Sequence, residues 1–527
     1  MPKVLISDKL SPAAVEIFRS RGIEVDLKAG LSPAELRAII APYDGLAIRS
    51  ATKVTRELLD AAENLKVVGR AGIGVDNVDV KSATARGVVV MNTPHGNAIT
   101  TAEHAIAMMF ALARQIPEAS ASTRAGKWEK NRFMGVELYG KTLGVIGCGN
   151  IGSIVAERAQ ALHMKVIAYD PFLTEPRALA LGVEKVELED LLPRADIITL
   201  HTPLTEATRS LLSREALAAC KRGVRVINCA RGGLVDEAAL AEALQSGQVA
   251  GAALDVFETE PAKESPLFAL DNVVCTPHLG AATSEAQENV ALQVAEQMSD
   301  FLLTGAVSNA INMPSVSAED APRLRPYMEL CRQLGAFAGQ MTQAQEGVIR
   351  RVAIEYEGAA AALNHKPLTA AALAGLLSPM LEGVNMVNAP VAARDRGIEV
   401  AETVHDRDSE YQTRVSVSVT TDRGTRSVAG TLFRGAPRLV EIKGIRVEAD
   451  FARHMLYVTN QDKPGFIGHF GATLAEAGIN IATFHLGRAA QGGDAICLVS
   501  VDEPVTEEVL ALVRHLPLVV QATSLSF

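Results

Sequence analysis

The chain has 527 residues, which is too long for a single hydrophobic core and indicates about three or four folded units. Its 48% hydrophobic and 21% charged residues exclude a disordered chain and are ordinary for a soluble globular enzyme. The net charge of −10 gives no broad basic field, which argues against a protein that binds nucleic acid or anionic membranes.

The first segment, from Lys3 to about Met91, alternates short β-rich runs with helical patterns. Such alternation predicts a parallel sheet covered by helices on both faces. The expected strands are Val4–Ser7, Leu46–Arg49, Val67–Arg70 and Val88–Met91, and the expected helices include Pro12–Arg21 and Pro33–Ile40. Thr100–Leu112 then reads as one helix that connects this lobe to the next.

A second alternation begins at Lys141 and has the pattern of a doubly wound nucleotide-binding sheet. The expected strands are Thr142–Ile146, Lys165–Tyr169, Ile197–Leu200, Arg225–Asn228, Ala250–Leu254 and Val273–Thr276, and the expected helices are Ile151–Leu162, Arg214–Ala219 and Glu237–Gln245. A long helix from Ser284 to about Leu303 can return the chain to the first lobe. In that case the first domain is discontinuous in sequence.

Around Ile311–Arg325 the chain reads as a loop, because Pro314, Pro322 and Pro326 are expected to interrupt any helix. A mixed domain without a recognisable catalytic motif follows, between about 326 and 450. Its expected helices are Met328–Thr342 and Leu368–Leu381, and its expected strands are Val352–Tyr356, Arg414–Thr420 and Ser427–Leu432.

The last segment predicts a split ferredoxin-like arrangement, with the order strand, helix, strand, strand, helix, strand. The expected elements are His454–Thr459, Phe466–Ala477, Asn480–Leu486, Asp494–Val501, Glu507–Leu516 and Val519–Leu525.

A glycine-rich turn, Gly147-Cys148-Gly149-Asn150-Ile151-Gly152, joins an expected strand to an expected helix. Gly147 permits the tight turn, Gly149 lets the backbone approach a pyrophosphate, and Gly152 allows close helix–strand packing. The helix N-terminus adds partial positive charge. The turn therefore predicts a dinucleotide site.

Asp170 stands at the end of the next expected strand, close to the spacing of about twenty residues at which a carboxylate accepts hydrogen bonds from the adenosine ribose. A 2′-phosphate would be repelled there, so NAD is favoured over NADP. The alternative is that Asp170 only caps a helix before Pro171.

Three polar segments, Asn228–Gly233, Asp255–Pro261 and Thr276–Gly280, follow expected strands of the second lobe. Sites in open α/β sheets form at the carboxyl ends of strands, so these loops are expected to converge. Oxidation of a carbinol carbon needs a base for the hydroxyl proton and a cation that holds and polarises the substrate. A His, an Arg and a carboxylate that orients the His supply these groups.

The motifs ARGGLVDE, DVFETEP and TPHLG in these segments resemble those of the D-isomer-specific 2-hydroxyacid dehydrogenase family. The resemblance covers residues 1–310 strongly and residues 453–527 well, and it extends to the long form with a C-terminal ACT domain. The middle domain resembles, less specifically, the allosteric substrate-binding domain of long forms.

The resemblance implies that Arg231 holds and polarises the substrate, that His278 is the general base in oxidation, and that Glu260 orients His278. Glu258 is the nearby rival, but the Glu of the family immediately precedes Pro. The expected cofactor-binding residues are Gly147, Gly149, Asn150, Ile151, Gly152, Asp170, Thr202, Cys229, Ala230, Arg231, Asp255, His278, Leu279, Gly280 and Ala281.

The expected fold class is α/β, with two doubly wound parallel-sheet lobes followed by two smaller domains. A flavodoxin-like substrate lobe is expected at 1–97 plus 286–314, and a Rossmann NAD domain at 98–285. An α+β intervening domain is expected at 315–450, and a ferredoxin-like ACT domain at 453–527.

A phosphorylated substrate needs additional cations, because guanidinium groups bind phosphate through paired hydrogen bonds. Arg49 and Arg70 match substrate-facing positions of the family, and Ala71, Gly72 and Ile73 can offer backbone N–H groups to a carboxylate. Lys130 and Arg132, in a segment through which the family forms homodimers or homotetramers, can reach a neighbouring subunit's site. The alternative for Arg49 and Arg70 is that they are ordinary surface arginines, and surface solvation explains Lys130 and Arg132 equally well.

The favoured reaction is the oxidation of D-3-phosphoglycerate to 3-phosphooxypyruvate, the first step of serine synthesis. The alternatives are a sister enzyme acting on glycerate, glyoxylate or lactate, and an NAD-gated sensor or scaffold without turnover. In the last domain, Asn460, Asp462 and Asn480 match ACT positions that hold an amino-acid effector such as serine. Turn and cap chemistry explains Asp462 and Asn480 equally well.

The six cysteines, at positions 148, 220, 229, 275, 331 and 497, show no CxxC spacing, so a reduced protein without a metal site is expected. Met1 to Ser7 lacks the apolar core of a signal peptide. No stretch approaches about 18 uninterrupted apolar residues, so no membrane span is expected. Cytoplasmic location follows as the expectation.

Overall fold

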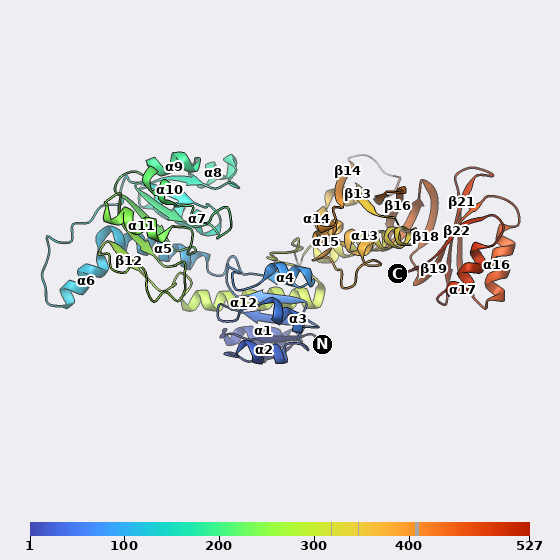
Figure 1. The fold of residues 1–527 in the computed structure, drawn as a ribbon, viewed down its shortest axis with the longest axis horizontal. Coiled ribbons are helices and arrows are strands. Elements are labelled where there is room, and N and C mark those ends of the chain that lie inside the picture. The colour runs from blue at the N-terminus through green and yellow to red at the C-terminus, as the bar shows by residue number, and fades with distance from the viewer. Residues whose placement is uncertain (318, 346, 406–409) are drawn as a thin grey trace.

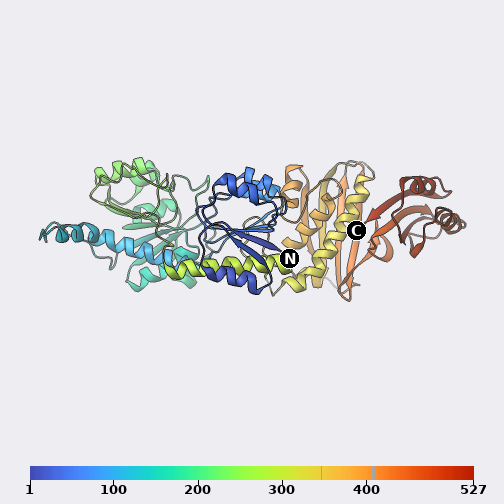
Figure 2. The same cartoon turned by 90° about the horizontal axis from the view of Figure 1, so that it is seen from below.

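The computed structural model describes residues 1–317, 319–345, 347–405 and 410–527. These residues form four sheets that succeed one another along an elongated molecule (Figures 1 and 2). The second lobe lies at one end, the first lobe lies beside it, and the middle and C-terminal domains follow. Among the described residues, no helix combines the length and the hydropathy that crossing a bilayer requires.

The first lobe is a sheet of five parallel strands in the order β2-β1-β3-β4-β5. Its elements are β1 (Lys3–Ile6), α1 (Pro12–Ser20), β2 (Glu24–Leu27), α2 (Pro33–Ile39), β3 (Gly45–Ile48), α3 (Arg56–Ala61), β4 (Val67–Arg70), α4 (Val80–Ala85) and β5 (Val89–Met91). We did not predict β2, α3 or α4. The edge strand β2 alternates charged and apolar residues and is only partly buried.

Helix α12 (Ser284–Thr304) returns the chain to this lobe and packs against α1, β3 and β4 (Figure 2). Val290, Val294 and Met298 of α12 share a buried core with Val4 and Phe18. A Cβ on Gly69 would lie 2.2 Å from the sulfur of Met298, so glycine is required for this close approach. The first lobe is therefore built from two separate stretches of chain.

The second lobe is a sheet of seven parallel strands in the order β12-β11-β10-β9-β6-β7-β8. It is reached through α5 (Ala98–Arg114) and α6 (Ile116–Arg124). Its further elements are β6 (Thr142–Ile146), α7 (Asn150–Ala161), β7 (Lys165–Tyr169), α8 (Glu175–Leu181), β8 (Glu184–Lys185), α9 (Leu188–Arg194), β9 (Ile197–Leu200), α10 (Arg214–Ala219), β10 (Val224–Asn228), α11 (Glu237–Gln245), β11 (Val249–Leu254) and β12 (Val273–Cys275). The strand order reverses between β6 and β9, where doubly wound sheets open a crevice for ligands.

The middle domain places two packed helices on a mixed sheet of order β14-β13-β15-β16-β17-β18. Its elements are α13 (Ala321–Gln343), β13 (Ile349–Gly358), the 3₁₀ turn η1 (Ala359–Ala362), α14 (His365–Leu377), α15 (Ala389–Asp395), β14 (Glu399–His405), β15 (Thr413–Thr421), β16 (Gly424–Phe433), β17 (Ala436–Ile442) and β18 (Ile445–Asp450). The side-chain amide of Asn385 donates to the carbonyl of Gly87 at 2.9 Å, which joins this domain to the first lobe.

Our expectation that Pro322 and Pro326 interrupt any helix was wrong, because α13 contains both. Pro322 lies in the first turn, where a backbone N–H has no acceptor within the helix. Pro326 removes one internal hydrogen bond, yet the helix continues because Leu330 and Leu334 bury its apolar face.

The C-terminal domain has the predicted ferredoxin-like order, with a sheet of order β20-β21-β19-β22. Its elements are β19 (His454–Gln461), α16 (Phe466–Glu476), β20 (Ile481–Arg488), β21 (Asp494–Val501), α17 (Glu507–Arg514) and β22 (Val519–Ser526). One face of the sheet packs on α16 and α17. Residues of the opposite face, including Tyr457 and Leu498, belong to the same core as Leu334 and Phe337 of α13. The predicted fold class is confirmed.

Candidate active site

A cleft of about 460 Å³ lies between the first and second lobes, within the size range of small-molecule sites. Its lining includes Arg70, Arg231 and His278, three residues singled out from the sequence. It also includes the expected cofactor contacts Ile151, Thr202, Cys229, Ala230, Gly280 and Ala281. The structure thus brings together the groups that the motifs predicted.

His278 and Glu260 form a close pair at the edge of this cleft. The Nδ1 atom of His278 lies 2.6 Å from a carboxylate oxygen of Glu260. The other carboxylate oxygen accepts from the backbone N–H of Phe257 at 3.1 Å. Burial alone would raise the pKa of Glu260, but the hydrogen bond from His278 and the N–H of Phe257 lower it. An ionised Glu260 requires the proton on Nδ1 of His278, which leaves Nε2 free to accept.

Glu258, the rival to Glu260, is exposed on the same loop. Its backbone N–H donates to the carboxylate of Glu237 at 2.6 Å, and its side chain does not line the cleft. The geometry therefore pairs His278 with Glu260.

Arg231 follows β10 and lies opposite the first lobe. Its Nε atom donates to the carboxylate of Asp76 at 2.8 Å, and Nη1 donates to the carbonyl of Ala230 at 2.6 Å. The side-chain amide of Asn228 donates to the carbonyl of Arg231 and fixes the turn. A Cβ on Gly232 would lie 1.8 Å from the carbonyl oxygen of Phe257, so this turn requires glycine.

Asp255 is fully buried beneath the loop that carries His278 and does not line the cleft. Its carboxylate accepts from the N–H groups of Leu279 at 2.7 Å and Gly280 at 2.8 Å, and from the hydroxyl of Thr276 at 2.6 Å. His104 of α5 lies 3.2 Å from the same carboxylate. Burial tends to raise the pKa of Asp255, but these hydrogen bonds lower it. The arrangement makes Asp255 a support for the loop.

The glycine turn fits a dinucleotide. Gly147 has a φ of 90°, and a Cβ on Gly152 would lie 2.0 Å from the carbonyl oxygen of Gly147. The space over Gly149 is open, where a pyrophosphate can approach the N-terminus of α7. Asp170 accepts from the N–H groups of Cys148 and Phe172 at 2.9 Å and 2.8 Å, which orients its carboxylate at the end of β7.

Arg70 from the first lobe and Arg231 from the second give the cleft a positive charge, and Arg49 lies near Arg70. Burial and the neighbouring charge of Arg231 lower the pKa of Arg70 to about 10, and Arg49 adds to this effect. The Nε atom of Arg70 is buried and has no hydrogen-bond partner among the described residues. Such a guanidinium is suited to an anionic substrate.

The expected backbone contribution of residues 71–73 is smaller than predicted. The N–H of Ala71 donates to the carbonyl of Ile48, and the N–H of Gly72 donates to the hydroxyl of Thr93. Both donors are therefore already used within the lobe. Of these three residues, only Ile73 lines the cleft.

Lys130 and Arg132 lie outside the cleft, in the segment that follows the projecting helix α6 (Figure 1). Arg132 forms an exposed ion pair with Glu129 at 3.3 Å. A single chain does not bring either residue to its own site.

The expected effector positions lie in the C-terminal domain. Asn460 is buried, and its carbonyl oxygen has no hydrogen-bond partner among the described residues. The carboxylate of Asp462 accepts from Gly492 and from Arg488, which lowers its pKa. The amide of Asn480 donates to Asp502 at 2.7 Å. Asp462 and Asn480 therefore already brace loops.

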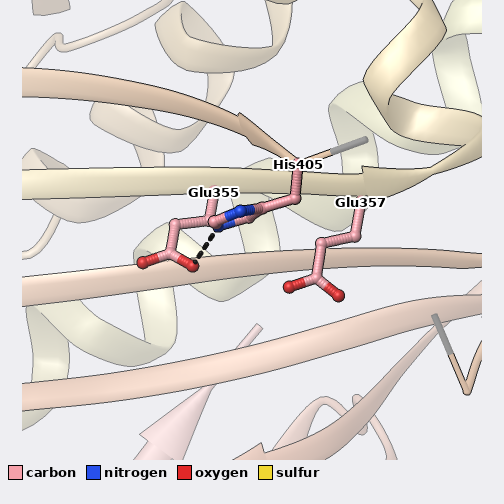
Figure 3. A group of neighbouring side chains, drawn as sticks. All are labelled: Glu355, Glu357 and His405. Carbon is pink, nitrogen blue, oxygen red and sulfur yellow. Dashed lines mark hydrogen bonds and ion pairs between the residues drawn. The ribbon is translucent and has the colours of Figure 1, made fainter. Parts of the chain in front are cut away.

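A further cluster of titratable groups lies on β13 and β14 of the middle domain (Figure 3). Glu355, Glu357 and His405 offer ligand-type atoms within 4.8 Å of one another. His405 pairs with Glu355 at 3.0 Å, and Arg414 donates to the buried Glu357 at 3.1 Å. The contact of His405 with Glu355 and the ion pair of Arg414 with Glu357 account for the cluster as a structural network.

The sequence profile of the D-isomer specific 2-hydroxyacid dehydrogenase NAD binding domain matches residues 106–280. The D-3-phosphoglycerate dehydrogenase intervening domain matches residues 323–443, and the ACT domain matches residues 454–517. The chain therefore belongs to the D-isomer specific 2-hydroxyacid dehydrogenases and, within them, to the family of the D-3-phosphoglycerate dehydrogenases.

The family membership rests on relatives that match nearly the whole chain. D-3-phosphoglycerate dehydrogenase of Bacillus subtilis is 44% identical over 98% of each chain, and that of Methanocaldococcus jannaschii is 43% identical over 98% of each chain. A glyoxylate reductase of Paecilomyes thermophila has a TM-score of 0.56 at 30% identity, over 59% of this chain and 98% of that chain. D-lactate dehydrogenase of Aquifex aeolicus, complexed with NAD and lactic acid, has a TM-score of 0.53 at 27% identity, over 59% and 100%.

His201 follows β9 and lies at the wall of the cleft. Because its side chain is buried, we expect the stability of the protein to depend on pH. Burial lowers its pKa to about 4 from an ordinary 6.5. Below about pH 6.5, His201 is therefore protonated in the unfolded chain but stays neutral in the folded chain. The free energy of unfolding thus decreases as the pH falls. At pH 5 this loss is about 2 kcal/mol.

His201→Gln is expected to flatten the decrease in the melting temperature between pH 7 and pH 5, measured by scanning calorimetry. His469→Gln, at an exposed histidine of α16, serves as the control and keeps the wild-type decrease. Equal pH profiles for His201→Gln and wild type would contradict the assignment.

Proposed function

We propose that the protein oxidises D-3-phosphoglycerate to 3-phosphooxypyruvate with NAD, the first step of serine synthesis. The observation that carries this proposal is one cleft lined by Arg231, the partly buried Arg70 and His278, which pairs with Glu260 at the edge of the cleft. The whole-length similarity to D-3-phosphoglycerate dehydrogenases supports the same substrate.

Each residue around the cleft has a separate role in the proposed reaction. Arg231 holds the substrate carboxylate and polarises the carbinol oxygen. The free Nε2 atom of His278 accepts the hydroxyl proton, while Glu260 holds the ring and stabilises the imidazolium. NAD, when bound, accepts the hydride from the carbon.

The phosphate of the substrate is assigned to Arg70 and Arg49, which lie at the ends of β4 and β3. The backbone N–H of Arg49 donates to Asp8 at 2.6 Å, which fixes the start of its loop. The cofactor is assigned to the glycine turn, to Asp170 and to the cleft residues from Thr202 to Ala281 that the sequence predicted. Asp255 acts from below by holding Leu279 and Gly280.

With these roles we assign the domains as a substrate lobe at 1–97 plus 286–314, an NAD domain at 98–285, an intervening domain at 315–450 and an ACT domain at 453–527.

We assign the protein to the cytoplasm, which its six free cysteines support. A homodimer or homotetramer through the α6 segment is supported by Trp128, whose side chain is 86% exposed. Lys130 and Arg132 would then reach the neighbouring site.

A sister activity on glycerate, glyoxylate or lactate is the alternative. Steady-state absorbance of NADH with 3-phosphoglycerate and glycerate as separate substrates discriminates between them. Higher kcat/KM on glycerate would overturn the proposal, and no turnover on either substrate would favour an NAD-gated sensor.

His278→Ala is expected to lower turnover by about 10²–10⁴-fold, because the hydroxyl proton loses its acceptor. NAD binding, measured by titration calorimetry, is expected to persist because the glycine turn is intact. Glu258→Gln, on the neighbouring loop, provides a matched control with near wild-type turnover. Unchanged turnover in His278→Ala would remove this residue from the mechanism.

Arg70→Gln is expected to raise KM for 3-phosphoglycerate by about 10–100-fold, because a charge-assisted hydrogen bond to an anion is lost. The KM for glycerate, which lacks the phosphate, is expected to change much less. Arg86→Gln, at an arginine paired with Asp60, serves as the control. An equal rise of both KM values would place Arg70 at the carboxylate instead.

Serine is proposed as the effector at Asn460, because the carbonyl oxygen of this side chain is buried and unpaired among the described residues. Titration calorimetry of serine into the full chain is expected to show saturable heat in wild type and at least about tenfold weaker binding in Asn460→Ala. The absence of any heat in wild type would remove serine as the effector.

A further inference from the structure

Asp76 is the one acidic residue among the described residues that line the active-site cleft. It lies in the loop that follows β4, and its side chain is 63% exposed. A carboxylate at this place opposes the binding of an anionic substrate, because it reduces the positive potential that Arg70 and Arg231 create. An offsetting role is therefore expected for it, and its contacts identify one.

The carboxylate of Asp76 holds one edge of the Arg231 guanidinium. The Nε atom of Arg231 donates to Oδ2 of Asp76 at 2.8 Å, across the boundary between the two lobes. The Nη1 atom donates to the carbonyl of Ala230 at 2.6 Å, within the second lobe. The Nη2 atom forms no hydrogen bond within the part of the chain that the structure describes. With two nitrogens held, the planar guanidinium is fixed in orientation, and Nη2 is left for a ligand.

The backbone of the first lobe leaves room for this guanidinium at Gly74. A Cβ on Gly74 would lie 1.6 Å from Nη2 of Arg231 and 2.7 Å from Oδ2 of Asp76. Any side chain at position 74 would therefore displace Arg231 from the ion pair. The contact between the lobes thus depends on the carboxylate of Asp76 and on the absence of a side chain two residues before it.

The loop that carries Asp76 is itself fixed to the first lobe. The side-chain amide of Asn77 donates to the carbonyls of Arg49 and Thr52 at 2.7 Å and 2.6 Å. Asp76 therefore presents its carboxylate from a held backbone, and the ion pair constrains the longer side chain of Arg231.

Asp76 also offsets the repulsion between the two arginines that line the cleft. Burial and the charge of Arg231 lower the pKa of Arg70 to about 10, whereas the charge of Asp76 opposes this shift. Without this carboxylate, Arg231 would be repelled by Arg70 and held only by the carbonyl of Ala230.

We propose that Asp76 is a positioning residue for the reaction, which holds Arg231 through Nε so that Nη2 meets the carboxylate of the substrate. The role rests on the proposed function, in which Arg231 binds that carboxylate. Asp76 acts through Arg231 and does not itself bind the substrate. Because the ion pair crosses between the lobes, opening of the cleft separates the two residues, and Arg231 is fixed only when the lobes lie close together.

The test is steady-state oxidation of 3-phosphoglycerate and of glycerate by the full chain, with the absorbance of NADH as the readout. Asp76→Ala is expected to lower kcat/KM by about 10–100-fold, because a charge-assisted hydrogen bond to Arg231 is lost. The factor is expected to be the same for both substrates, since both carry the carboxylate that Arg231 binds. Asp76→Asn, which keeps an acceptor but loses the charge, is expected to lie between Asp76→Ala and wild type.

A double-mutant cycle separates a role through Arg231 from a structural role in the first lobe. Arg231→Lys replaces the guanidinium by a single ammonium, which has no Nε to be held while another nitrogen binds the substrate. Adding Asp76→Ala to Arg231→Lys is expected to change kcat/KM by less than about threefold. Asp60→Ala, at an aspartate that pairs with Arg86 outside the cleft, is the matched control and is expected to keep the wild-type kcat/KM.

Binding of oxamate to the enzyme–NADH complex, followed by the fluorescence of NADH, separates the role of Asp76 from the proposed substrate. Oxamate carries a carboxylate but no phosphate, and its binding requires no turnover. Asp76→Ala is expected to weaken this binding by about tenfold or more. A wild type that binds oxamate in this Asp76-dependent way but oxidises neither substrate would refute the proposed function alone.

Four results would overturn the role of Asp76. Unchanged kcat/KM and oxamate affinity in Asp76→Ala would show that Arg231 is positioned without it. Tighter oxamate binding in Asp76→Ala would show that Asp76 competes with the substrate for Arg231. Losses that multiply in the double variant would assign Asp76 a structural role. A wild type that neither oxidises a hydroxy acid nor binds oxamate would overturn both proposals, and if only oxamate fails to bind, the kcat/KM values decide.

Discussion

The buried carboxylate of Asp255 is the constraint on which the active site depends. It accepts hydrogen bonds from two successive backbone N–H groups, those of Leu279 and Gly280, and from the hydroxyl of Thr276. These bonds hold the chain after β12 in a course that places His278 at a φ of 56°, a conformation that is uncommon for residues other than glycine. The imidazole is thereby directed toward Glu260. The position of His278 at the cleft thus rests on a group that does not line the cleft.

The cleft itself exists because two parallel sheets direct their carboxyl ends toward one another. Helix α12 makes this possible by leaving the second lobe just after the His278 loop and burying Val290 and Met298 in the first lobe. Arg231 and Asp76 form an ion pair that crosses from lobe to lobe. Arg70 therefore lies on the wall opposite Arg231 and His278, and a change in the angle between the lobes alters its distance from them.

The sequence predicted best those elements in which a clear residue pattern coincides with a fixed geometry. Strands β6 and β7 have the predicted bounds, because buried parallel strands are short apolar runs. The loops that carry Arg231 and His278 were expected to converge because they follow strands of one parallel sheet, and the family resemblance singled out the two residues within those loops. The edge strand β2 was missed because charged residues alternate along it. The helix Met328–Thr342 was predicted, but the first turns of α13, residues 321–327, were missed because tertiary packing outweighs the two prolines. His104 and Asp76 carried no local signal, since only the folded chain brings them to Asp255 and Arg231.

Helix α13 and the C-terminal sheet share one hydrophobic core, which joins the last two domains. Tyr457 and Leu498 lie against Leu334 and Phe337, so one side of the terminal ferredoxin-like unit is already occupied by its own chain. Removing the C-terminal unit would expose an apolar surface on the preceding domain. Fusing the unit to another protein would likewise expose the apolar face of its sheet. The last two domains thus form one packed unit, and helices α16 and α17 cover the face of the terminal sheet that is turned away from the middle domain.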